Sequence, residues 1–187
     1  MSTAEADEAR RFVDELRQAL ARKPKAERQV VFVGVLNKHI GARRPAVLVG
    51  GALVEFYTGG AYVTGDIDLI GDGDVIVRLL TAAGFERSGR VFVHTDLELT
   101  VDVAGDTLRQ TETVESVEVA GYRVPAVSVE DAIVDRLLAA KYWRSRTDWE
   151  QAVLLWMAHR DRIRRDELIK KARANEVEDK LEALMAV

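Results

Sequence analysis

The chain of 187 residues contains no cysteine and only three histidines. Without cysteine the protein has no disulfide, no thiolate nucleophile and no cysteine-bound zinc. The histidines, His39, His94 and His159, are too scattered for the spacing of a zinc site. The sequence also lacks the Gly-x-Ser-x-Gly turn of many serine hydrolases. The chemistry that remains is that of carboxylates with a metal ion.

Long apolar runs and a strong net charge are missing as well. No stretch is long enough to span a bilayer, and the acidic, polar N-terminus is unlike a signal peptide. We therefore expect a cytoplasmic protein with no membrane partner. The net charge of −4 gives no overall field that would collect nucleic acid. Local basic clusters, such as Arg144 with Arg146, are typical of solvated helix faces, so they permit an RNA acceptor without indicating one.

A glycine pair follows the first apolar strand-like run. The run Val47 to Val49 predicts a buried strand, and Ala52 to Tyr57 predicts the first turns of a helix. Gly50 and Gly51 between them have no Cβ, so the backbone can turn tightly and approach a bound group. The free N–H groups at the start of a helix favour phosphate oxygens. The pattern suits a nucleoside triphosphate, although a tight turn without any ligand would give the same sequence.

Two aspartates, Asp66 and Asp68, alternate with aliphatic residues a little further on. In a strand they would project to the same face. Carboxylates this close raise each other's proton affinity unless a cation neutralises them. Mg²⁺, which prefers carboxylate oxygen and bridges to phosphates, would do so. A solvated strand end is the alternative.

A third carboxylate, Asp102, lies between Val101 and Val103 in an alternating run. The segments 90–94 and 97–103 predict two neighbouring strands joined by a short turn. The three acids together would suit a two-metal site.

An EF-hand calcium loop starting at Asp66 is excluded because Ile70 and Val77 occupy its fifth and twelfth positions. Asp72 and Asp74 instead predict the turn and N-cap of a helix over 74–83.

Three regions follow from these patterns: packing helices over 1–44, a core over 45–127 and a helical region over 128–187. The first contains predicted helices over 4–20 and 26–40, and the core ends in a pair of short strands that closes at Pro125. Strands and helices in this order predict an α/β (α+β) fold, with a mixed sheet flanked by helices and a C-terminal helical bundle extension.

The C-terminal helical region begins with a capping-box-like pair, Ser128 and Asp131. Its three tryptophans, Trp143, Trp149 and Trp156, are interpreted as core or interface anchors.

The order of these motifs resembles that of the DNA polymerase β-like nucleotidyltransferase superfamily. More narrowly, the chain is similar to small prokaryotic nucleotidyltransferase-fold proteins related to AbiEii-type toxins. The resembling motifs are Gly50-Gly51, Thr64-Gly65-Asp66-Ile67-Asp68 with the preceding Tyr57-Thr58-Gly59-Gly60, and His94-Thr95-Asp96 before Asp102. The last of these favours Asp102 over Glu98 as the third acid. Ala61 departs from the pattern, because such proteins often carry a basic residue there.

The resemblance implies catalytic and metal-binding roles for the three aspartates, with Mg²⁺ or Mn²⁺ as the cofactor. It implies a nucleotide-binding role for Gly50, Gly51 and Thr64. It also implies that Lys141 faces the triphosphate with support from Asp148. A surface lysine is the alternative for Lys141.

The function that the resemblance implies is transfer of a nucleoside monophosphate from a nucleoside triphosphate to a hydroxyl acceptor. The acceptor would be RNA or tRNA, a protein or a small molecule. The alternative is a non-catalytic binding or regulatory module of the same fold, such as a toxin–antitoxin component with a protein partner. The sequence leaves the acceptor and the preferred base open.

Overall fold

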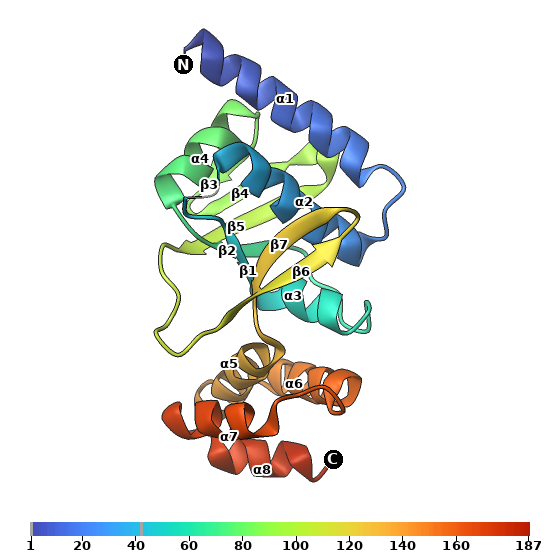
Figure 1. Cartoon of the computed structure of the whole chain (residues 1–187), viewed down its shortest axis with the longest axis vertical. Coiled ribbons are helices and arrows are strands. Elements are labelled where there is room, and N and C mark those ends of the chain that lie inside the picture. The colour runs from blue at the N-terminus through green and yellow to red at the C-terminus, as the bar shows by residue number, and fades with distance from the viewer. Residues whose placement is uncertain (1, 42) are drawn as a thin grey trace.

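The computed structural model describes residues 2–41 and 43–187. In these ranges the chain forms eight α-helices and one seven-stranded mixed sheet, which confirms the predicted α+β class. The N-terminal helices, the sheet and the C-terminal helices follow one another along the long axis of the molecule (Figure 1). None of the helices in the described ranges is both long enough and apolar enough to cross a bilayer.

The two N-terminal helices are α1 (Thr3–Leu20) and α2 (Lys25–Ile40). Helix α1 begins at a capping box, in which Ser2 Oγ accepts from Glu5 N at 3.3 Å and Ser2 N donates to Glu5 Oε2 at 2.6 Å. Helix α2 lies between α1 and the sheet, and it is buried on all sides from Val30 to Leu36. A helix that is apolar all round belongs inside a core, so α2 forms part of the core with α1 packed outside it.

The sheet has the strand order β3-β4-β5-β2-β1-β7-β6. Pairs β2/β5 and β1/β7 are parallel, and the remaining neighbours are antiparallel. The strands are β1 (Val47–Val49), β2 (Ile67–Ile70), β3 (Glu86–Ser88), β4 (Val91–His94), β5 (Leu99–Gly105), β6 (Val114–Val119) and β7 (Tyr122–Val127). Helix α3 (Gly50–Tyr57) follows β1 in the chain, and helix α4 (Gly73–Ala82) follows β2. A short 3-10 turn, η1 (Thr95–Leu97), joins β4 to β5.

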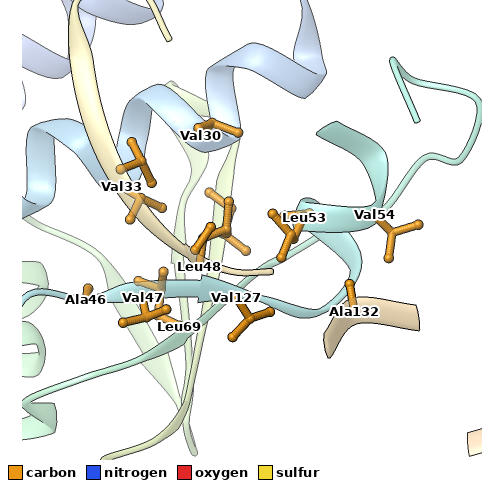
Figure 2. Packing of buried hydrophobic residues seen from close by; sticks show 14 of the residues in the cluster. Val30, Val33, Ala46, Val47, Leu48, Leu53, Val54, Leu69, Val127 and Ala132 are labelled. Atoms are coloured by element: carbon orange, nitrogen blue, oxygen red, sulfur yellow. The ribbon is translucent and has the colours of Figure 1, made fainter. Parts of the chain in front are cut away.

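Buried hydrophobic residues of the core surround β1 (Figure 2). Leu48 of β1 is fully buried together with Val33 of α2, Leu53 of α3 and Leu69 of β2. Burial of an aliphatic side chain of this size stabilises a protein by about 1.5–3 kcal/mol. The strand that leads into the glycine pair is therefore anchored from both sides, which fixes the position of the turn that follows it.

Four helices form the C-terminal region: α5 (Val129–Tyr142), α6 (Arg146–His159), α7 (Arg165–Ala174) and α8 (Glu178–Met185). The predicted cap at its start is confirmed, because Ser128 Oγ accepts from Asp131 N at 3.2 Å. Helices α5 and α6 pack on α3, which joins this region to the sheet. The buried contact between them includes Val54 of α3 and Ala132 of α5.

One prediction about a single residue was wrong. Strand β7 does not close at Pro125 but continues to Val127. A residue without an N–H is tolerated there because the β1/β7 pairing is confined to the register position Leu48↔Ala126. Of the two interpretations of Trp143, a core or an interface anchor, its 81% exposure excludes the core. It follows the last residue of α5, where the chain leaves the helix and Arg144 turns with a φ of +54°.

Candidate active site

The glycine pair forms a tight turn between β1 and α3. Gly50 has a φ of +64°, and a Cβ at this position would lie 1.9 Å from Asp68 Oδ2. Gly51 N donates a hydrogen bond to the same oxygen at 3.0 Å. The close approach that the glycines permit is therefore an approach to Asp68, and the N–H of Gly51 binds this carboxylate.

Strand pairing places Asp68 and Asp102 side by side. Asp68 is in register with Val49 of β1 on one side and with Asp102 of β5 on the other. Neighbouring strands lie about 4.8 Å apart. Two carboxylates from segments more than thirty residues apart are thus brought together at the middle of the sheet.

Asp66 precedes β2 and is held by Thr64. Thr64 Oγ1 donates to Asp66 Oδ1 at 2.9 Å, and Thr64 N donates to Oε2 of the buried Glu55 at 2.8 Å. A Cβ on Gly51 would lie 2.8 Å from Thr64 Oγ1, so the threonine also packs against the glycine turn. Thr64 therefore connects the glycine turn to Asp66 and orients the carboxylate of that residue.

The charges of Asp66 and Asp102 both act on Asp68. Burial raises the pKa of Asp68, and the charges of Asp66 and Asp102 raise it further. The hydrogen bond from Gly51 and the charge of Arg136 act in the opposite direction. A cation bound between these carboxylates would favour their ionised forms.

Asp102 has spare capacity to bind a ligand. Its side chain is 6% exposed, and Oδ2 forms an ion pair with Arg90, whose Nη2 lies 2.8 Å away. Its other oxygen, Oδ1, is buried without a hydrogen-bond partner among the described residues. A buried acceptor left unsatisfied costs about 1–3 kcal/mol. An ion that takes this oxygen as a ligand would remove that cost.

The donor set fits a hard divalent cation, because all of its candidate ligands are carboxylate oxygens. As the side chains stand, residues 2–41 and 43–187 contain no group of three or more His, Cys, Asp or Glu residues that could hold a metal ion. Binding of a cation to all three aspartates would therefore require some of their side chains to rotate.

Lys141 and Asp148 do not pair with each other. Lys141 Nζ donates to Glu176 O at 2.6 Å and to Asp179 Oδ1 at 2.7 Å, so it is directed toward α8. Asp148 Oδ1 accepts from Arg136 Nη1 at 2.8 Å instead. Five residues separate positions 136 and 141 along α5, which is about 140° around a helix. The side chains of Arg136 and Lys141 consequently point in different directions from α5.

Arg136 is a half-buried cation that sequence reasoning missed. Its side chain is 17% exposed, and besides Asp148 it contacts Asp135 Oδ2 at 2.5 Å and Gln151 Oε1 at 3.1 Å. Its charge lowers the pKa of Asp68. The sequence signal for it was weak, because an arginine beside an aspartate on a helix is a common surface pattern. Arg90, the partner of Asp102, was missed for a similar reason.

Ala61 lies in the exposed loop between α3 and β2. Its N–H donates to Thr58 O at 3.3 Å. The side chain at this position thus faces solvent, next to the segment that leads into Asp66.

Comparisons with protein-family models, with curated proteins and with solved structures give no match for this chain. The resemblance to nucleotidyltransferases accordingly rests on the order of the motifs. The features of the chain that bear on its function are the carboxylates, the glycine turn and the two arginines described above.

Proposed function

We propose that the protein is a magnesium-dependent nucleotidyltransferase, which transfers a nucleoside monophosphate from a nucleoside triphosphate to a hydroxyl acceptor. The observation that carries the proposal is the register of Asp68 with Asp102 beside the glycine turn. Two buried or half-buried carboxylates next to each other repel one another unless a cation lies beside them, and such clusters are frequent at functional sites. The unpartnered Oδ1 of Asp102 supports the same conclusion.

Asp66, Asp68 and Asp102 would hold the cation, with Mn²⁺ as a substitute for Mg²⁺. A bound divalent ion offsets the charge on the phosphates and on the leaving pyrophosphate. Asp102 would also accept the proton of the acceptor hydroxyl. Gly51 and Thr64 would keep Asp68 and Asp66 oriented toward the nucleotide. Most of the rate enhancement would come from this positioning and from electrostatics, with no covalent intermediate.

The charge-offsetting role expected of Lys141 fits Arg136 better. Arg136 is fixed by Asp148 and Gln151, and its charge acts on Asp68. Because Nη1 donates to Asp148 and Gln151 and Nη2 to Asp135, Arg136 would act on a triphosphate mainly through its positive charge. We therefore assign Arg136 to the triphosphate side of the site, with Asp148 as the residue that positions it.

A thermal-shift titration with ATP, GTP, CTP and UTP, each with and without Mg²⁺, tests the proposal. A nucleotide present at about a hundred times its dissociation constant should stabilise the native state by roughly 2.7 kcal/mol. The shift should require Mg²⁺ and be lost in Asp66→Ala/Asp68→Ala. The matched control, Glu118→Ala/Glu150→Ala, removes two exposed acids elsewhere and should keep the shift.

The acceptor is then sought with a labelled nucleotide. Incorporation into total RNA, into protein or into a small-molecule pool would distinguish the three acceptor classes. If no nucleotide shifts the unfolding temperature, the enzyme proposal fails. In that case the non-catalytic module becomes the better description, and a protein partner should be sought.

A further inference from the structure

The guanidinium of Arg90 occupies one side of the carboxylate cluster. Arg90 Nη2 lies 2.8 Å from Asp102 Oδ2. The two partners differ in exposure, because the side chain of Arg90 is 68% exposed and that of Asp102 is 6% exposed. Asp102 is therefore fixed within the sheet, whereas Arg90 reaches it from the surface. Rotation of the arginine side chain alone would free the carboxylate.

The backbone holds Arg90 beside Asp102 independently of this ion pair. Arg90 follows Gly89, which turns the chain between β3 and β4 with a φ of +64°. Arg90 O accepts a hydrogen bond from Val103 N at 3.2 Å, and the next residue, Val91, is in register with Asp102. The guanidinium is thus tethered within reach of Asp102 by strand pairing. Replacement of the side chain leaves this pairing in place.

A guanidinium and a divalent cation would both bind the carboxylate of Asp102. Each is attracted by a buried carboxylate whose charge is also felt by Asp68. Two cations on Oδ2 would repel each other, so one has to leave before the other can bind fully. Arg90 is the one that can leave, since its side chain regains water at the surface.

We propose that Arg90 is a positioning residue of the cation site, which holds Asp102 in the cation-free protein and competes with the divalent ion for it. This inference rests on the proposed function, because it takes the three aspartates as the cation site. The competition makes binding of a divalent ion alone weak. A nucleotide adds phosphate oxygens as ligands of the ion, so that the ion then displaces Arg90 from Asp102.

Titration with Mn²⁺ alone, followed by the electron paramagnetic resonance signal of the free ion, tests the inference without any activity measurement. We expect Arg90→Gln to bind Mn²⁺ about tenfold more tightly than the natural chain, a difference of about 1.4 kcal/mol. Arg123→Gln is the matched control, because it makes the same change in net charge at an exposed site on β7. It should bind like the natural chain at the same ionic strength. The double variant Arg90→Gln/Asp102→Asn should not show the tighter Mn²⁺ binding expected of Arg90→Gln.

The outcomes separate this inference from the proposed function. Unchanged or weaker Mn²⁺ binding in Arg90→Gln, with binding to the natural chain intact, overturns the role of Arg90 and leaves the proposed function standing. Absence of Mn²⁺ binding in every variant, Arg90→Gln included, overturns the inference, whereas the proposed function is decided separately by the Mg²⁺-dependent nucleotide shift. Should Arg90→Gln fail to fold by circular dichroism, Arg90→Ala decides. It also removes the positive charge from Asp102, so tighter Mn²⁺ binding supports the inference and equal binding overturns it.

Discussion

At the scale of single residues, Gly50 shows how closely the backbone approaches the candidate site. Any side chain there meets two penalties, a left-handed φ of +64° and a contact of 1.9 Å with Asp68 Oδ2. Gly59 has nearly the same φ, +61°, but a Cβ at that position would have no other atom within 4 Å. Gly50 and Gly59 can therefore be compared directly, because they share the same backbone conformation and only Gly50 lies against another side chain.

We predict that Gly50→Ala destabilises the protein clearly more than Gly59→Ala does. The Gly59 variant should lose about 1–2 kcal/mol, from the left-handed backbone alone. The Gly50 variant adds displacement of Asp68, so it should also lose any Mg²⁺-dependent nucleotide shift. Urea unfolding of the two variants measures the difference. Equal losses would mean that the contact with Asp68 is not maintained in solution.

Asp68 itself is predicted to reduce stability at neutral pH. Its pKa is raised above 3.8 in the folded protein, chiefly by burial. The ionised form is therefore less favourable in the folded than in the unfolded chain, and the resulting loss of stability develops as the pH rises from 3.8 through the folded-state pKa. Asp68→Asn should unfold at a higher temperature than the natural chain at pH 7. The gap should close as the pH falls toward 3.8.

The control for this measurement is Asp161→Asn, which removes an exposed acid from the turn after α6. It should leave the unfolding temperature almost unchanged across the same pH range. A lower unfolding temperature for Asp68→Asn at pH 7 would contradict the prediction. It would mean that the hydrogen bond from Gly51 outweighs burial and the neighbouring charges.

At the scale of elements, the sequence was informative where the governing interactions are local. The strand, glycine turn and helix at Val47 to Tyr57 follow from apolar periodicity and from the two glycines, and so does the cap at Ser128. The bounds of the four helices that were predicted individually, α1 to α4, agree within about two residues. Local pattern also identified the alternating run that contains Asp102.

What the sequence did not reveal depends on contacts between distant segments. The partner of Asp102 is Arg90, across a strand pair, and the partner of Arg136 is Asp148, across two helices. Neither pairing leaves a periodic signal, because each residue taken alone looks like an ordinary surface charge. The exposure of Trp143 is similar, since it depends on where the chain leaves α5. Residue type predicted the three carboxylates, whereas topology determined their cationic neighbours.

Helix α7 is attached to the rest of the protein by a buried ion pair. Lys171 Nζ lies 2.8 Å from Asp131 Oδ1 and donates to Thr111 O at 2.5 Å and to Thr113 Oγ1 at 3.1 Å. The side chains of Lys171 and Asp131 are 7% and 6% exposed. The lysine thus joins α7 to the start of α5 and to the segment before β6.

We predict that Lys171→Met destabilises the protein by about 3–5 kcal/mol, because it leaves Asp131 buried without its partner. The matched control on the same helix is Arg173→Met, which breaks the exposed pair with Glu178 and should change stability by about 0–1 kcal/mol. Urea unfolding measures both. Losses of similar size in the two variants would mean that water reaches Asp131 and replaces the lysine.

At the scale of the whole molecule, helix α3 connects the sheet to the C-terminal helices. Leu53 packs toward the sheet, and Val54 packs toward Ala132 of α5 (Figure 2). The same short helix thus serves two hydrophobic contacts. Loss of either contact should weaken the other, so we expect the chain to unfold as one cooperative unit.

This expectation can be checked with two probes of urea unfolding. The three tryptophans all lie between the end of α5 and the end of α6, so their fluorescence reports on the C-terminal helices. Far-ultraviolet circular dichroism reports on the helices of the whole chain. The two transitions should coincide. A fluorescence transition at lower urea would instead define residues 128–187 as an independently unfolding unit.

The open order of the sheet, with β3 at one edge and β6 at the other, has a consequence for behaviour at high concentration. Unpaired strand edges are templates on which strands of other molecules can add. Strand β3 has only three residues, all exposed, and two of them are Glu86 and Arg87. Strand β6 carries Glu115 and Glu118 along its length. The shortness of β3 and the charged residues on both edges oppose such strand addition, so the protein should stay dispersed where a flatter and more apolar sheet would form fibrils.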